Sequence, residues 1–192
     1  MIIGLTGLPA SGKATVSKYL EQNHQFTTLV FSDIIKQELF KKQVSSPNRN
    51  DYKQMAKLLR QTHGDGALAK LLIDKIKAED FNIDKNYILD GIRTMGEVEE
   101  LKKVNGQIWA VTAPAEKRLK WMKSRNREID ITITLEELKT LDQKELYSAN
   151  NTKGDLNLSE TIKNADFTIE NNGSVEELNE KIRSSLLQNL SQ

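Results

Sequence analysis

The chain has 192 residues with 28 basic and 27 acidic side chains, a net charge of +1, and no cysteine. This length suits one domain with one core, and the near-neutral charge argues against a broadly basic surface for nucleic acid. Without cysteine, disulfides and thiolate metal sites are excluded. The first residues lack the basic region and the long apolar stretch of a signal peptide or membrane span, so we expect a cytoplasmic protein without a membrane partner.

Short apolar runs of strand length alternate with helical patterns through the first half of the chain. Strands are expected at 2–6, 26–31 and 87–89, and helices at 14–22, 33–40, 51–62 and 66–77. The second of these helices is expected to carry Ile34, Ile35, Leu39 and Phe40 on one face. Residues 44–50 contain a proline and several polar side chains, which is typical of a loop.

The same alternation continues to the end of the chain. Strands are expected at 107–111 and 167–170, helices at 95–103, 115–124, 135–149 and 175–190, and a polar loop at 150–157. Strands that alternate with helices predict a parallel sheet covered on both faces, with ligands at the carboxyl ends of the strands. That rule would gather Gly7, Asp33, Asp90, Thr112 and Asn171 along one edge.

Residues 7–15 read Gly-Leu-Pro-Ala-Ser-Gly-Lys-Ala-Thr and connect the first strand to the first helix. Glycines at both ends let successive backbone N–H groups curl around phosphate oxygens, and Lys13 adds a positive charge for the terminal phosphates. A plain glycine-rich turn is the alternative, but the flanking strand and helix favour a phosphate-binding loop. Ala14 follows the lysine where a hydroxyl residue is common, so residue 14 cannot coordinate magnesium directly.

Four further features accompany the loop. They are Ser32-Asp33 with Lys36, then Arg60, then Asp90-Gly-Ile-Arg93, and the segment 117–127 with six basic residues and no acidic one. Each has an ordinary explanation, such as a helix cap for Asp33 or a solvated charge for Arg60. Together they supply what phosphoryl transfer needs, because that reaction depends mainly on positioning and on stabilising negative charge.

The features divide into a donor side and an acceptor side. The loop would hold the donor, and Asp90 can order the water shell of Mg²⁺. Lys36, Arg60 and Arg93 would hold an anionic acceptor. We expect residues 125–132 to be a mobile lid that closes over both ligands and excludes water.

This set of motifs resembles the nucleoside monophosphate kinase-like branch of the P-loop kinases, in particular the archaeal adenylate-kinase-like and dephospho-coenzyme A kinase-like proteins. The resemblance rests on 7–15, 31–33 with Lys36, 55–60, 88–93 with 97–99, Arg118, Arg125 and Arg127, and 165–174. It implies a three-layer α/β P-loop NTPase fold with a five-stranded parallel sheet, in a single domain over 1–192. An acceptor-binding helical region would span about 33–80 and a lid about 118–136.

The resemblance also implies an ATP-dependent kinase that uses Mg²⁺ and passes the γ-phosphoryl group to a nucleoside monophosphate. Donor contacts would come from Gly7, Ala10, Ser11, Gly12, Lys13, Ala14, Thr15, Arg118, Asn171 and Gly173. The acceptor would lie against Asp33, Lys36, Arg60 and Arg93. Catalysis would involve Lys13, Asp33, Arg125 and Arg127, and Mg²⁺ would lie near Asp90 and Thr15.

Two departures from the family pattern concern the acceptor. Lys36 stands where adenylate kinases carry arginine, which replaces a bidentate grip by a point charge. The spacing from Asp90 to Arg93 is one residue shorter than in adenylate kinases and fits the archaeal-type relatives.

Two alternatives to a nucleoside monophosphate kinase remain open, and we expect a monomer or a homodimer in each case. One is a dephospho-coenzyme A kinase, although those enzymes commonly carry two aspartates after the second strand and this chain has Ser32 at the first position. The other is a regulatory ATPase or nucleotide-binding protein that keeps the fold.

Overall fold

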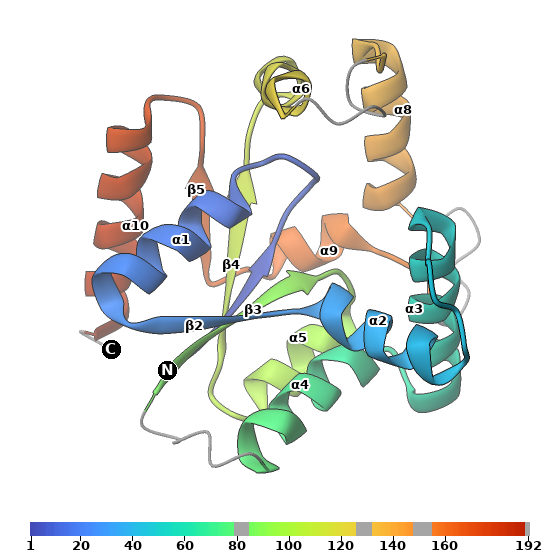
Figure 1. Ribbon diagram of the computed structural model, residues 1–192. Coiled ribbons are helices and arrows are strands. Elements are labelled where there is room, and N and C mark those ends of the chain that lie inside the picture. The colour runs from blue at the N-terminus through green and yellow to red at the C-terminus, as the bar shows by residue number, and fades with distance from the viewer. Residues whose placement is uncertain (79–84, 126–131, 148–154, 191–192) are drawn as a thin grey trace.

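The computed structural model describes residues 1–78, 85–125, 132–147 and 155–190. Its centre is a five-stranded sheet in the order β2-β3-β1-β4-β5, and every neighbouring pair is parallel (Figure 1). The strands are β1 (Ile2–Thr6), β2 (Phe26–Val30), β3 (Asn86–Ile92), β4 (Gln107–Thr112) and β5 (Phe167–Glu170). This is the expected α/β P-loop NTPase fold.

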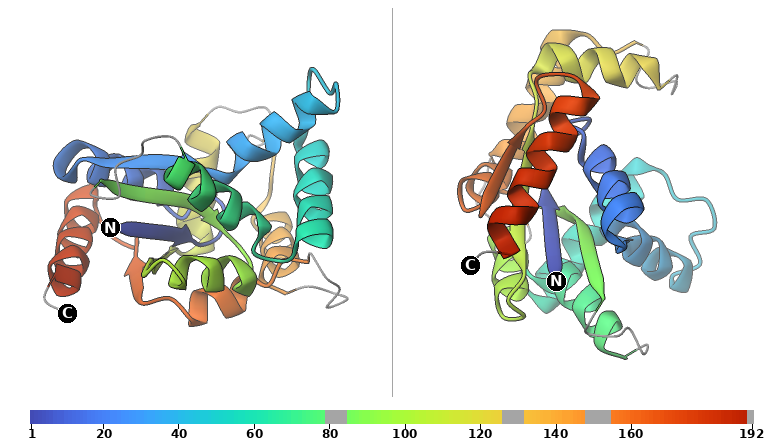
Figure 2. Two further views of the ribbon diagram at one scale, coloured as in Figure 1. Left: turned by 90° about the horizontal axis from the view of Figure 1, so that it is seen from below. Right: turned by 90° about the vertical axis from the view of Figure 1, so that its left-hand side faces the viewer.

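Helices cover both faces of the sheet, as the alternation of strands and helices predicts. They are α1 (Lys13–His24), α2 (Phe31–Lys41), α3 (Arg49–His63), α4 (Ala67–Ala78), α5 (Met95–Lys102), α6 (Ala115–Ser124), α8 (Leu135–Leu146), α9 (Leu158–Lys163) and α10 (Val175–Leu190). One apolar core joins α1 and α10 to the sheet, and a second joins α2 to α5 to the opposite face (Figure 2). None of the helices in the described ranges has the length and hydropathy that a membrane crossing needs.

Strand β3 shows how its sequence produces the layers. Side chains alternate across a strand, so Tyr87 and Leu89 enter the core beneath α2 to α5 while Ile88 enters the core of α1 and α10. These three side chains are at most 1% exposed. A strand that is buried on both faces needs the continuous apolar run that 87–89 provides.

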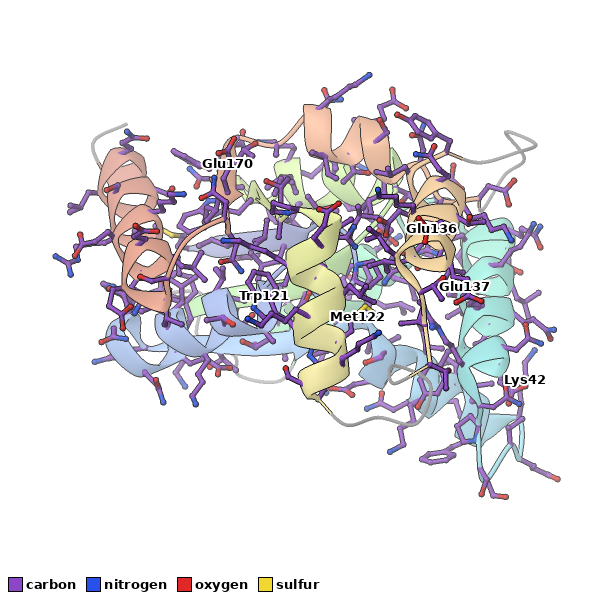
Figure 3. The ribbon with its side chains drawn as sticks, turned by 90° about the horizontal axis from the view of Figure 1, so that it is seen from above. Lys42, Trp121, Met122, Glu136, Glu137 and Glu170 are labelled. Atoms are coloured by element: carbon purple, nitrogen blue, oxygen red, sulfur yellow. The ribbon has the colours of Figure 1, made fainter. Side chains whose placement is uncertain are left out.

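Helices α6 and α8 lie beyond the carboxyl ends of the strands, above the edge where the ligands are expected (Figure 1). A small apolar cluster of Met122 and Leu138 with Ala10 joins these two helices to the loop after β1. Seen from above, α6 lies across the sheet, and α8 lies to one side of α6, toward α3 (Figure 3). These helices therefore cover the phosphate-binding loop.

Element boundaries differ from the sequence prediction where a cap or an irregular strand decides them. Helix α2 begins at Phe31, which was expected to end the preceding strand. Helix α3 begins at Arg49, because Asn48 and Asp51 form a reciprocal capping box inside the expected loop. Strand β3 continues past Asp90 to Ile92, with a register shift opposite the end of β1.

Three other expectations need correction or completion. Phe40 is 48% exposed and does not join the core, because only one stripe of α2 faces the sheet. Helix α9 was not predicted from the sequence, since six residues are too few to show a helical period. The helix expected at 135–149 ends at Leu146, where Tyr147 turns to an extended conformation, and residues 148 and 149 lie outside the described residues.

Candidate functional site

The loop between β1 and α1 follows a path that requires glycine at both ends. Gly7 has a φ of 135°, and a Cβ atom there would lie 2.2 Å from the carbonyl oxygen of Val111. Gly12 has a φ of 109°, and its Cβ would lie 2.3 Å from the side-chain nitrogen of Asn171. Between them, Ala10 adopts a left-handed φ of 61°, a conformation that costs energy and concentrates at functional sites.

Asn171 holds this loop from the end of β5. Its Nδ2 donates to the carbonyl oxygen of Ser11 at 2.9 Å, and its backbone N–H donates to that of Thr112 at 2.7 Å. The side chain is buried at 7% exposure. Asn171 therefore holds the backbone of the loop in place. This role differs from the contact with the donor nucleotide that was expected of it.

A shallow cavity of about 270 Å³ lies beside the same turn. It is lined by Thr112, Ala113, Pro114, Glu170 and Asn172. Gly173 follows in the turn, where an added Cβ would collide with the carboxylate of Glu177. The expected place for the donor base is next to this cavity, and that assignment stays a prediction.

The amine of Lys13 lies inside the loop. Its Nζ donates to the carbonyl oxygen of Gly7 at 2.7 Å and to that of Leu8 at 3.1 Å. Burial lowers the pKa of Lys13 from 10.5 to about 8, the charge of Asp90 opposes this shift, and the charge of Arg93 adds to it. The pKa of Asp90 is raised overall, because burial outweighs the opposing effect of the positive charges of Lys13 and Arg93.

The loop has the polar groups that bound phosphate oxygens would need. Gly12 caps α1 without a side-chain hydrogen bond, and the first turn of α1 has no acidic residue. Among the described residues, no partner accepts from or donates to the buried Oγ of Ser11. Free backbone N–H groups at the positive end of a helix are suited to an anion, so the site fits a nucleotide phosphate chain.

The groups near the loop also fit a magnesium ion that is held mainly by water and phosphate. No three acidic or histidine side chains gather into a metal site within the described ranges. Asp90 provides a carboxylate in the cavity, and Thr15 lies in the first turn of α1. Mg²⁺ usually binds through one or two carboxylates together with phosphates and waters, which is compatible with Asp90 and Thr15.

Nucleotide affinity is expected to depend on pH through Lys13. As the pH rises past about 8, Lys13 loses its proton, so the dissociation constant for ATP should rise by up to about tenfold per pH unit. The free energy of unfolding of the ligand-free protein should rise with pH over the same range, because the unfolded state binds more protons than the folded state between about 8 and 10.5. Calorimetric titrations from neutral to alkaline pH would measure the affinity. Lys13→Arg should remove the inflection, since arginine stays charged.

A cavity of about 740 Å³ extends from the loop to α3 and α8. Its basic lining residues are Lys13, Arg49, Lys53, Lys57, Arg60, Arg93, Arg125 and Lys144, and its acidic ones are Asp90, Glu145 and Asp155. The loop and the end of β3 form one end of this cavity. Helix α3 contributes four of the basic residues. Three of them, Arg49, Lys53 and Lys57, are spaced four positions apart and therefore lie on one face of the helix.

Arg60 forms a buried ion pair with Glu97, a residue that was not expected to belong to the site. Its Nε and Nη2 donate to Oε1 of Glu97 at 3.0 and 2.8 Å, and both side chains are almost fully buried. The other oxygen of Glu97 accepts from the backbone N–H groups of Arg93, at 2.7 Å, and Thr94, at 3.2 Å. Thr94 and Glu97 form a capping box, a signal that was readable in the sequence.

Arg118 is 2% exposed and braces the loop from its outer side. Its guanidinium donates to the carbonyl oxygens of Pro9 at 3.2 Å and Ala113 at 3.1 Å, and it pairs with both carboxylate oxygens of Asp142 on α8. The structure thus places Arg118 against the loop. Whether it also reaches the donor phosphates stays a prediction.

Two expected acceptor residues do not line the cavity. Asp33 and Lys36 are exposed, and the Nζ of Lys36 lies 5.4 Å from the centre of the Phe40 ring. The cavity is lined instead by Phe31, Ser32 and Ile35. Because successive positions of a helix turn by about 100°, residue 33 lies on the side of α2 opposite to residue 35. Lys36 follows Ser32 by one turn, and its amine lies toward Phe40 rather than in the cavity.

The expected lid arginines lie at the edge of what the structure describes. Arg125 is exposed and lines the cavity. Arg127, and with it most of the expected lid at 125–132, lies outside the described residues.

Solved structures with the same fold include three bacterial proteins. TT1252 from Thermus thermophilus has a TM-score of 0.62 and 20% identity, with 99% of this chain and 97% of the other covered. Shikimate kinase from Bacteroides thetaiotaomicron has a TM-score of 0.59 and 12% identity, covering 100% and 99%. Shikimate kinase from Acinetobacter baumannii in complex with shikimate has a TM-score of 0.56 and 20% identity, covering 98% and 93%. At these identities the similarity shows the fold alone, which is the α/β P-loop NTPase fold.

Sequence relatives extend over nearly the whole chain. A UPF0200/UPF0201 protein of Archaeoglobus fulgidus is 34% identical over 97% of this chain, which spans only 55% of that protein's length. A UPF0200 protein of Sulfurisphaera tokodaii is 32% identical, covering 94% of this chain and 92% of its own length. A third, from Thermococcus kodakarensis, is 30% identical over 95% of each chain. The family described as "AAA domain" matches residues 3–145. The chain therefore belongs to the UPF0200 proteins and contains an AAA-type P-loop domain.

Proposed function

We propose that this protein is an ATP-dependent phosphotransferase that uses Mg²⁺ and transfers the γ-phosphoryl group to a nucleoside monophosphate. The observation that supports this most is the composition of the larger cavity. That cavity connects the phosphate-binding loop and Lys13 with a second group of cationic side chains, Arg49, Arg60 and Arg93 among them. A donor on the loop and an anionic acceptor beside it could therefore share this cavity.

The charge of the cavity differs from that of the whole chain. Eight basic and three acidic side chains line it, whereas the complete sequence has a net charge of only +1. The transition state of phosphoryl transfer carries spread negative charge, which positive groups fixed in advance stabilise. An ATPase that transfers the phosphoryl group to water would not need a second group of cations in addition to those of the loop.

The size and walls of the cavity are also compatible with a nucleotide acceptor. A volume of about 740 Å³ lies within the usual range for small-molecule sites. Apolar side chains, including Phe31, Ile35, Leu141 and Leu156, line it beside the basic ones. Such walls can take a base or sugar while the cations bind phosphate.

The assignment can be tested with a panel of acceptors. The protein would be incubated with ATP and Mg²⁺ plus one ribo- or deoxyribonucleoside monophosphate at a time, then with dephospho-coenzyme A and with shikimate. We expect at least one nucleoside monophosphate to stimulate ADP formation strongly. Stimulation by dephospho-coenzyme A alone would favour that kinase activity instead. Slow ADP formation that no acceptor changes would support a regulatory ATPase and contradict the proposal.

Arg93→Ala is expected to weaken the acceptor much more than ATP. Arg93 lies past the register shift near the end of β3 and lines the cavity. Loss of a hydrogen bond to a charged group costs about 1.5 to 3 kcal/mol, which should appear in KM for the acceptor. Steady-state kinetics with each substrate varied would measure the two effects. Arg183→Ala, on α10 and outside the cavity, is the control, and equal losses for both substrates would contradict the assignment.

A further inference from the structure

Two arginines of the larger cavity converge on one carboxylate. Oε2 of Glu145 accepts from Nη1 of Arg93 at 3.2 Å, and its Oε1 lies 4.0 Å from Nη2 of Arg49. Arg49 begins α3, Arg93 lies just past the end of β3, and Glu145 belongs to α8. Three elements that are distant in sequence therefore meet at this carboxylate.

Glu145 forms a hydrogen bond with only one of the two arginines. The distance to Arg93 is that of a hydrogen bond, whereas 4.0 Å to Arg49 is too long for one. In this position the carboxylate accepts a hydrogen bond from Arg93 and none from Arg49. A tetrahedral phosphate carries more acceptor oxygens and up to two negative charges, so it can bind both arginines at once.

Glu145 is also unusual for its surroundings. It is only 8% exposed, and it is one of three acidic side chains among eight basic ones that line the cavity. Without an anion between them, Arg49 and Arg93 would repel each other. The carboxylate supplies that anion from within the chain.

We infer that Glu145 occupies, in the free protein, the place of the acceptor's phosphate group, and that Arg49 and Arg93 together bind this group when the carboxylate withdraws. The ligand class is a phosphate monoester dianion or a larger phosphate anion. This inference rests on the proposed function for the identity of the acceptor, but the anion site can be tested without turnover. Glu145 then competes with the acceptor.

A purely structural role for Glu145 predicts the opposite change in anion affinity when Glu145 is replaced. If Glu145 only holds Arg93 in a productive position, its removal should weaken anion binding. If Glu145 competes with the anion, its removal should strengthen binding. Glu145→Gln separates the two, because it keeps the size and the acceptor oxygen of the side chain and removes the charge.

The experiment fills the loop with Mg²⁺ and a non-hydrolysable ATP analogue, then titrates inorganic pyrophosphate by calorimetry. Glu145→Gln should bind pyrophosphate about three- to fivefold more tightly than the unchanged protein, the gain expected from removing a partly exposed ion pair. Arg49→Ala should bind it more weakly by a similar factor. Arg49 is more than half exposed, so this variant should fold and provides a second test. Glu136→Gln removes the same charge from the exposed start of α8 and should change nothing (Figure 3).

Weaker or unchanged pyrophosphate binding by Glu145→Gln would overturn the inference. The acceptor panel provides an independent result. If Glu145→Gln tightens pyrophosphate binding but no acceptor stimulates ADP formation, the anion site stands and the kinase proposal fails. If an acceptor is phosphorylated and its KM does not fall in Glu145→Gln, the kinase proposal stands and the competition fails.

Discussion

Lys13→Ala is expected to lower turnover by about 100- to 1000-fold, the usual effect of removing one fixed group that stabilises transition-state charge. Lys13 lies within the phosphate-binding loop, where its amine contacts the carbonyl oxygens of Gly7 and Leu8. Bound phosphates would replace these carbonyl contacts with stronger, charge-assisted ones. The rate of ADP formation at saturating ATP and acceptor measures the effect.

A matched control separates the loss of this amine from the loss of any positive charge. Lys18 is an exposed residue of the same helix, so Lys18→Ala should leave turnover nearly unchanged. Both variants should keep the melting temperature within a few degrees of that of the unchanged protein. Near-normal turnover in Lys13→Ala would show that the loop is not catalytic.

Glu97→Ala is expected to reduce the free energy of unfolding by about 3 to 5 kcal/mol, because it leaves the buried guanidinium of Arg60 without its partner. Glu97 is fully buried and accepts two hydrogen bonds from Arg60. It also accepts from the backbone at Arg93 and Thr94, so the start of α5 loses its cap as well. Urea unfolding followed by circular dichroism would give the difference.

Glu99→Ala serves as the control for this stability effect. Glu99 is an exposed residue of α5, so its replacement should change the unfolding free energy by no more than about 0.5 kcal/mol. Acceptor binding should also weaken in Glu97→Ala, because the same carboxylate positions both Arg60 and the backbone at Arg93. A loss in Glu97→Ala as small as in the control would show that the buried pair adds little to the fold.

The sheet and the loop could be predicted because their signals are local. Continuous apolar runs such as 87–89 are what a doubly buried strand needs, and Gly7 and Gly12 stand where an added Cβ atom would collide with a neighbour. Capping boxes at Asn48 and Thr94 were equally local. Reading the first of them would have placed the start of α3 at Arg49.

The partners of the site residues could not be predicted in the same way. Arg60 and Glu97 are 37 positions apart, and Arg93 and Glu145 are 52 apart, so only the folded chain brings them together. The expected roles of Asp33 and Lys36 depended on which face of α2 meets the cavity. A helix that starts at Phe31 presents residues 31, 32 and 35 there, and sequence alone did not fix that orientation.

The central claim is that the γ-phosphoryl group of ATP moves to a small acceptor bound in the larger cavity. The most direct measurement follows ATP that carries a radiolabelled γ-phosphate, with Mg²⁺ and the acceptor that stimulates ADP formation most. We expect the label to appear on the acceptor, which becomes a nucleoside diphosphate. We also expect this transfer to fall in Lys13→Ala and in Arg93→Ala. Label that accumulates only as inorganic phosphate, at a rate that no acceptor changes, would contradict the account.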